Sequence, residues 1–251
     1  MATLCARGLS GLPEVRRGDD LAELIVSALG TERLREGQLL AIAHKAISKA
    51  EGAVRALADV RPGTRARELA EKQGSDPRAV QVVLEESTEL LRAERGVLIC
   101  RTRHGFVCAN SGVDGSNAPS PETLVLLPRD PDASARRIRA RLRELTGVAA
   151  AVMITDSFGR AWRHGQLDVS IGLAGMQPLD DWRGRTDATG HELLATWLAV
   201  ADAAAAAADL ARAKDSREPV VIIDGLERYV TADDGPGAAA LLRPLAEDLF
   251  R

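Results

Sequence analysis

The stretch ITDSFGRAWRHGQLDVSIG, residues 154–172, carries the clearest signal in the chain for both fold and chemistry. It continues the apolar run from Val148 to Ile154, which predicts a buried β-strand. Asp156 and Ser157 come at the end of that run. A strand end that delivers a carboxylate and a hydroxyl group suits a divalent cation. The alternative is that Asp156 and Ser157 cap a following helix.

A glycine-containing turn with two arginines, Arg160 and Arg163, follows at once. Guanidinium groups make bidentate contacts with oxyanions, so we assign both arginines to an anionic group of a substrate. Trp162 lies between them and offers a ring for stacking on a flat heterocycle. Core packing is the alternative role for this tryptophan.

A second cluster, GVDGSN at residues 112–117, also follows an apolar stretch. Its glycines permit close backbone approach, while Asp114 and Asn117 offer a metal ligand and a polar contact. Taken alone, the cluster is typical of a surface turn, because Asp-Gly and Ser-Asn pairs favour turns. Paired with Asp156, it predicts one shared magnesium or manganese site completed by phosphate oxygens.

The segment HKAISK at residues 44–49 places Lys45 and Lys49 four residues apart. On a helix they share a face, where their charges repel unless an anion neutralises them. A solvated surface is the alternative interpretation. His44 lies in the same segment, but the four histidines of the chain are dispersed and none is paired at metal-binding spacing.

Periodicity and turn residues predict a mixed α/β fold in which helices and short strands are interleaved. The predicted helices cover residues 20–29, 64–73, 76–92, 130–145 and 190–213, with a terminal helix beginning at 238–242. The predicted strands cover residues 38–42, 124–127, 148–154 and 220–223, with a hairpin formed by 97–101 and 105–109. Irregular spacing and the hairpin argue against a simple doubly wound sheet. Residues 11–14 are expected to form a loop.

The composition and the missing motifs argue against several classes of protein. A net charge of −3 argues against nucleic-acid binding, which needs a clustered basic excess. The three cysteines have no metal-binding spacing and suit reduced thiols. Cys100 and Cys108 are expected to be small buried residues, with a place on paired strands as the alternative. We see no signal-peptide core and no membrane-spanning stretch, so we expect a cytoplasmic protein without membrane contact. Walker A, Rossmann, zinc-protease and serine-hydrolase motifs are absent from the sequence.

Taken in order, the motifs resemble the coenzyme F420-0:γ-glutamyl ligase family. The matching segments are GLPEVRRGDDL (11–21), AHKAISKAEG (43–52), GVDGSN (112–117), residues 154–172, and DDGPGAAALLRP (233–244). The resemblance implies a family-specific mixed α/β fold, a homodimer, and one ligase unit over residues 1–251, with two intertwined subdomains as the alternative organisation. It does not include the nitroreductase-like second domain that some members carry.

The resemblance also implies a reaction. GTP would activate the carboxylate of F420-0 as an acyl phosphate, and the amine of L-glutamate would attack it to form a γ-linked amide. Mg²⁺ or Mn²⁺ would offset phosphate charge, with K⁺ as a further candidate ion. The alternatives are an amide ligase for another carboxylate acceptor and a non-catalytic homologue that binds a nucleotide or metabolite.

The resemblance also assigns roles to individual residues, by their positions in the matching segments. The resemblance assigns metal binding to Asp114, Asp156 and Ser157. It assigns nucleotide contacts to Leu12, Pro13, Glu14, Val15, His44, Lys49, Asn117 and Lys214. Arg160 and Arg163 are left to the acyl phosphate or the substrate phosphodiester, on physical grounds.

The chain departs from the family pattern at three places. His44 replaces a small hydroxyl residue, and Leu167 stands where other members have threonine. The loop 212–218 lacks the glycine that often precedes the position of Lys214. None of these departures removes a carboxylate of the predicted metal site.

Overall fold

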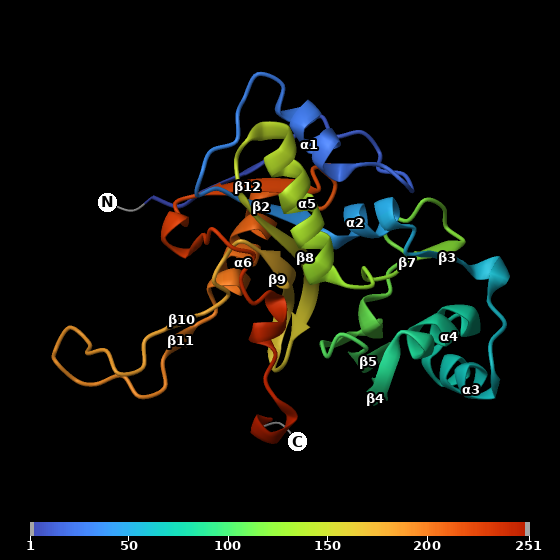
Figure 1. Cartoon of the computed structure of the whole chain (residues 1–251). Helices are drawn as coiled ribbons and strands as arrows, with labels where there is room; N and C mark the ends of the chain where they lie inside the picture. Colours follow the sequence, from blue (N-terminus) through green and yellow to red (C-terminus); the bar gives the residue numbers. More distant parts are fainter. Residues whose placement is uncertain (1–2, 249–251) are drawn as a thin grey trace.

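The structure, a computed structural model, describes residues 3–248. A five-stranded sheet in the order β1-β12-β2-β8-β9 forms its centre (Figure 1). Its strands are β1 Cys5–Gly8, β2 Leu39–Ala43, β8 Ala151–Arg160, β9 Arg163–Ala174 and β12 Val220–Asp224. Strands β2 and β8 run parallel, and the other neighbours in this sheet are antiparallel. The mixed α/β prediction is confirmed, and the sheet is not doubly wound.

Helices cover both faces of the sheet. The helices are α1 Leu21–Leu29, α2 His44–Glu51, α3 Thr64–Gln73, α4 Pro77–Glu85, α5 Pro131–Thr146 and α6 Val200–Ala211. Successive strand residues point to opposite faces, so Leu40 and Ile42 pack with α1, α2 and α5. Leu39 and Ala41 pack instead with α6 on the other face.

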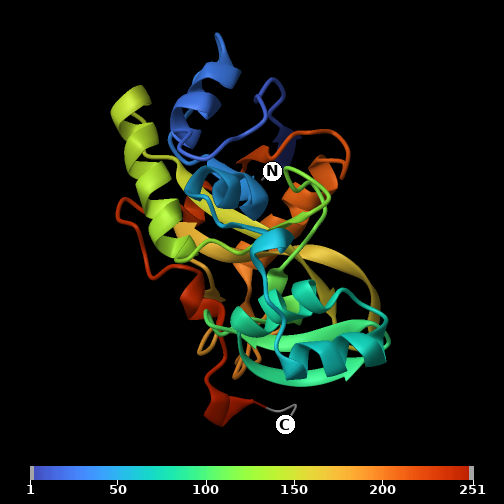
Figure 2. The same cartoon turned by 90° about the vertical axis from the view of Figure 1, so that its right-hand side faces the viewer.

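A smaller lobe lies beside the sheet and contains α3, α4 and three antiparallel strands (Figures 1 and 2). These strands are β4 Ser87–Glu94, β5 Val97–Thr102 and β6 Val107–Ala109. The lobe has its own apolar core, which includes Leu98 and Cys100. Phe106 of the lobe meets Phe158 of β8 edge-on, with ring centroids 6.1 Å apart. This contact places the lobe against the predicted site strand.

Short elements complete the chain. A pair formed by β3 Val54–Ala56 and β7 Thr123–Val125 flanks the smaller lobe, and β10 Asp180–Asp181 pairs with β11 Trp197–Leu198. The 3₁₀ turns are η1 Leu57–Asp59, η2 Asn110–Gly112, η3 Glu227–Tyr229, η4 Ala238–Leu241 and η5 Leu245–Glu247. The segment around β10 and β11 extends from the body as a long arm (Figure 1).

Most predicted elements are confirmed within a few residues. Asp20 caps α1 by accepting from the backbone N–H groups of Ala22 and Glu23. Asp130 caps α5 in the same way, and Pro131 occupies its first turn. The hairpin of β5 and β6 forms as predicted, with Cys100 opposite Cys108. Both of these thiols are buried and free, as expected.

Three predicted boundaries are wrong. The helix predicted over 76–92 ends at Glu85, because the hydroxyl of Ser87 bonds back to the Val83 carbonyl and the chain then pairs with β5. The helix predicted over 190–213 begins at Val200, because the residues before it form the returning half of the arm. The terminal helix predicted from 238–242 is a 3₁₀ turn that ends shortly before Pro244.

The strand predicted over 148–154 is also misplaced, because β8 continues to Arg160. Asp156 and Ser157 therefore lie within a strand, and the helix-cap alternative for them is wrong. Strands β1, β3, β9, β10 and β11 were not predicted, and most of β4 lies in the predicted helix 76–92. No helix among residues 3–248 is long and apolar enough to cross a bilayer.

Candidate functional site around helix α2

The start of α2 is set by the parallel pairing of β2 and β8. Ala43 ends β2 opposite Thr155, and α2 begins with the next residue, His44. Ala43 provides no side-chain cap and the first turn holds no acidic residue. The first N–H groups of the helix and its positive dipole end are therefore available to an anion.

His44 brings α2 against Asp156. The His44 side chain is 2% exposed, and its Nε2 lies 3.3 Å from Asp156 Oδ1. Its Nδ1 lies 3.3 Å from the hydroxyl of the buried Ser48. The predicted nucleotide contact at His44 thus lies directly beside a predicted metal ligand.

Lys45 brings the 112–117 segment to the same helix. Its ammonium lies 2.5 Å from Asp114 Oδ2 and 2.5 Å from the Ser116 hydroxyl. Burial alone would raise the pKa of Asp114, but hydrogen bonds from Lys45 and Ser116 outweigh it and lower that pKa below its usual value. The carboxylate is held in its charged form, and Lys45 occupies one of its oxygens.

Lys49 of α2 contacts the predicted nucleotide-binding loop at residues 12–15. Its ammonium lies 2.5 Å from Glu14 Oε1, while Glu14 itself is 71% exposed. Val15 is buried and Leu12 packs against the core, so the loop is anchored at both sides of its exposed centre, Pro13 and Glu14. This arrangement joins two of the predicted nucleotide-binding segments.

Asn117 lies in the turn that follows Asp114. It is exposed and has a positive φ of 53°, which asparagine tolerates better than most residues. The surface-turn interpretation of GVDGSN is therefore correct in its local geometry. It does not compete with the functional interpretation, since Lys45 holds this turn against α2.

A second polar cluster lies on the other face of β8. Ser157 donates to Asp168 Oδ1 at 2.6 Å, and Thr155 donates to Asp168 Oδ2 at 2.8 Å. Arg212 forms an ion pair with this carboxylate, whose side chain is 1% exposed. Lys214 donates to the Ser157 hydroxyl at 2.9 Å. The predicted residues Ser157 and Lys214 are thus brought together.

This cluster keeps the carboxyl group of Asp168 in its charged form. Burial would raise the pKa of Asp168, but the guanidinium of Arg212 and two hydroxyl donors outweigh it and lower the pKa. Sequence reasoning missed both Asp168 and Arg212. The signal for Asp168 was a lone carboxylate inside the apolar run LDVSIG, a placement that requires a buried partner.

Asp156 and Ser157 point to opposite faces of the sheet. Neighbouring residues in a strand alternate in direction, and the cross-strand register is regular here, with Asp156 opposite Val169 and Ser157 opposite Asp168. Asp156 faces α2, and Ser157 faces the Asp168 cluster beside α6. Their side chains therefore belong to two adjoining subsites.

Asp156 also faces the smaller lobe. Burial, the Asp156 charge and Cys100 together raise the pKa of the Cys108 thiol to about 12. This thiol therefore stays protonated and unreactive at neutral pH. Cys108 is therefore not a candidate nucleophile for this site.

The predicted arginines lie farther out. Arg160 ends β8 and Arg163 begins β9, at the exposed tip of the hairpin. Arg160 donates to the carbonyl of His164. The tip is four residues beyond Asp156, about 13 Å at strand spacing. Trp162 is 83% exposed, so the core-packing alternative for it is wrong.

The donor set suits a hard cation that shares its coordination shell with phosphate. Within residues 3–248, no group of three or more His, Cys, Asp and Glu side chains could hold a metal ion alone. Mg²⁺ commonly binds one or two carboxylates and takes its other ligands from phosphate and water. Asp156 fits that role best, since Asp114 and Ser157 already make contacts with lysine side chains.

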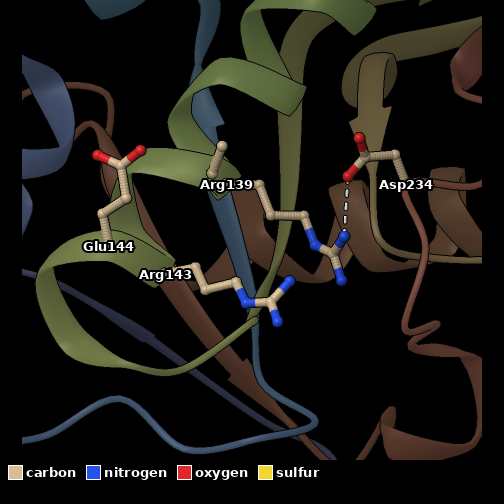
Figure 3. A pocket seen from close by; sticks show the side chains of 5 residues that line it. Arg139, Arg143, Glu144 and Asp234 are labelled. Atoms are coloured by element: carbon tan, nitrogen blue, oxygen red, sulfur yellow. Dashed lines mark hydrogen bonds and ion pairs between the residues drawn. The ribbon is translucent and has the colours of Figure 1, made fainter.

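A surface pocket of about 490 Å³ lies elsewhere, on α5 (Figure 3). Its lining is Arg139, Ala140, Arg143, Glu144 and Asp234. The buried Arg139 pairs with Asp234 at 2.8 Å and donates to the Thr231 carbonyl, which fastens this loop to α5. None of the predicted site residues lines the pocket, and its contacts are structural.

Comparison with known proteins agrees with the motif order. Residues 11–225 match the sequence profile of the family described as F420-0:Gamma-glutamyl ligase. A protein named Coenzyme F420:L-glutamate ligase from Methanopyrus kandleri is 46% identical over 240 residues, covering 95% of this chain and 94% of that protein. A protein of the same name from Methanothermobacter thermautotrophicus is 44% identical and covers 97% of both chains.

A third relative with this name, from Archaeoglobus fulgidus, is 42% identical over 244 residues and covers 97% of this chain. The profile match includes the loop at 12–15, helix α2, the 112–117 turn and β8, which are the segments that the structure brings together. The chain therefore belongs to the F420-0:γ-glutamyl ligase family.

Proposed function

We propose that this chain is a GTP-dependent ligase that joins L-glutamate to coenzyme F420-0 through a γ-linked amide. The observation that carries the proposal is the convergence on one helix of three distant segments. Glu14, Asp114 and Asp156 each meet a different side chain of α2, namely Lys49, Lys45 and His44. Nucleotide and metal groups are needed side by side in phosphoryl transfer.

The charges around α2 suit a nucleoside triphosphate. Lys45 and Lys49 lie on one side, and the uncapped start of α2 adds backbone N–H donors. On the opposite face of β8, Lys214 lies beside Ser157 and is 68% exposed. We assign the loop at 12–15 and Asn117 to the guanine nucleotide. Arg160 and Arg163, at the hairpin tip, would contact the phosphodiester of the acceptor.

The proposed reaction has two steps. An oxygen of the acceptor carboxylate attacks the γ-phosphorus of GTP, the bond to the bridging oxygen breaks, and GDP leaves. The amine of glutamate then attacks the acyl carbon, phosphate leaves, and the amine loses a proton. The amide is γ-linked when the activated group is the γ-carboxylate of a glutamate already attached. When bound at Asp156 and Asp114, Mg²⁺ or Mn²⁺ would offset phosphate charge. Lys45 and Lys49 would stabilise the same charge by direct contact.

The direct test is mass spectrometry of the products. Purified protein with F420-0, GTP, Mn²⁺ and L-glutamate should give adducts heavier by one or more glutamate residues. Asp114→Asn should abolish product formation, while Asp181→Asn, in an exposed ion pair of the arm, should retain it. Absence of product with GTP, or equal product with ATP, would contradict the proposal.

The family resemblance adds three further proposals. We expect a homodimer, which light scattering would test, and a cytoplasmic location. K⁺ is proposed as an additional activating ion, to be tested by replacing it with Na⁺ in the same assay.

A further inference from the structure

The two ring nitrogens of His44 have different surroundings. Nδ1 lies 3.3 Å from the hydroxyl of Ser48, and both side chains are buried. Nε2 is also buried, yet it has no hydrogen-bond partner among residues 3–248. The carboxylate oxygen Oδ1 of Asp156 lies 3.3 Å from Nε2. A buried polar nitrogen that approaches a carboxylate without an aligned hydrogen bond requires an explanation.

The approach of Nε2 to Asp156 matches the geometry of two ligands on one cation. Bonds of about 2.1 Å that meet at a right angle place two donor atoms about 3 Å apart. The ring nitrogen then directs its lone pair at the ion and not at the neighbouring oxygen. In a hydrogen bond the Nε2–H group would point at that oxygen instead, and Nε2 makes no hydrogen bond among residues 3–248.

Ser48 completes this geometry. A histidine that binds a metal through one nitrogen usually donates the N–H of the other to a neighbouring acceptor. The Ser48 hydroxyl is in place to accept from Nδ1, which leaves the lone pair on Nε2. Ser48 is fully buried one helical turn after His44, so α2 fixes the ring orientation.

We propose that His44 Nε2 is a direct ligand, together with Asp156, of the divalent cation in this site. The inference rests on the metal-binding role of Asp156 in the proposed function. Imidazole nitrogen favours transition-metal ions over Mg²⁺. This chain should therefore prefer Mn²⁺ more strongly than a His44→Ser variant does.

Electron spin-echo spectroscopy of bound Mn²⁺ tests the inference directly. Wild-type protein with Mn²⁺ and GDP should show the modulation of a coordinated ¹⁴N nucleus. The modulation should change when the protein is labelled with ¹⁵N-histidine, a result that needs no variant to fold. It should disappear in His44→Ser and persist in His191→Ser, where the histidine is exposed on the arm.

Titration of the protein with Mn²⁺ and with Mg²⁺ gives a second test. We expect His44→Ser to raise the dissociation constant of Mn²⁺ about tenfold and that of Mg²⁺ less than threefold. Tight Mn²⁺ binding that is lost in Asp156→Asn but shows no histidine modulation would overturn the inference and leave the proposed function intact. Mn²⁺ binding that is unchanged in Asp156→Asn, or no Mn²⁺ binding at all, would overturn both the inference and the proposed function.

Discussion

The ammonium of Lys49 lies 2.5 Å from the carboxylate of Glu14 and joins α2 to the loop at residues 12–15. The lysine is 11% exposed and the glutamate 71% exposed, so the pair lies at the edge of the site. Pairs with one partner in water add little to stability. We therefore interpret this contact as one that positions the loop.

Replacing Lys49 with methionine should weaken nucleotide binding without unfolding the protein. We expect the dissociation constant of GDP to rise about tenfold, equivalent to about 1.4 kcal/mol. Calorimetric titration measures this change. Lys72→Met, at the exposed end of α3, is the matched control and should bind GDP like the wild type. Equal affinity in both variants would argue against the nucleotide assignment of Lys49.

Replacing Asp168 with asparagine should destabilise the fold strongly. Arg212 is 9% exposed and would lose its charged partner. Breaking a buried pair on one side costs about 3–5 kcal/mol. For a chain of this size that corresponds to a decrease in melting temperature of about 10 °C. Asp181→Asn removes an exposed partner of Arg183 and should leave the melting temperature unchanged.

Acid should destabilise the wild type through the same carboxylate. The pKa of Asp168 is lower in the folded protein than its usual value of 3.8. Its stabilising contribution is therefore complete above the unfolded pKa and is lost as the pH falls through the folded value. Unfolding free energies measured from pH 5 to pH 2 should fall less steeply in Asp168→Asn. Parallel curves for the two proteins would refute this assignment.

Periodicity predicted the elements whose pattern comes from one buried face. The helices at 21–29 and 131–146 have such faces and side-chain caps, and both were found. Prediction failed where tertiary pairing decided the structure. Residues 87–94 look helical locally but form a strand because β5 lies beside them. The second half of the arm was missed for the same reason.

The sequence predicted which segments form the site but not the direction in which each side chain points. The sequence predicted that Asp114 and Asp156 share one metal site, and in the structure each carboxylate contacts a side chain of α2, Lys45 or His44. The sequence could not show that the side chains of Asp156 and Ser157 diverge, because the predicted strand ended at Ile154, before both residues. Arg212 was missed since nothing in its own segment marks it as the partner of Asp168.

The divergence of Asp156 and Ser157 leads to a prediction about energetic coupling. Ser157 contacts Asp168 at 2.6 Å, so Ser157→Ala and Asp168→Asn should show a coupling energy of about 1 kcal/mol or more. The Asp156 side chain faces away from the Ser157 side chain, and the Ser157 backbone N–H that donates to Asp156 Oδ1 at 2.8 Å remains in Ser157→Ala. Ser157→Ala and Asp156→Asn should therefore be additive within about 0.5 kcal/mol. Urea unfolding of the single and double variants measures both cycles. If the couplings were reversed, Asp156 and Ser157 would share a subsite, and the two-face arrangement would be incorrect.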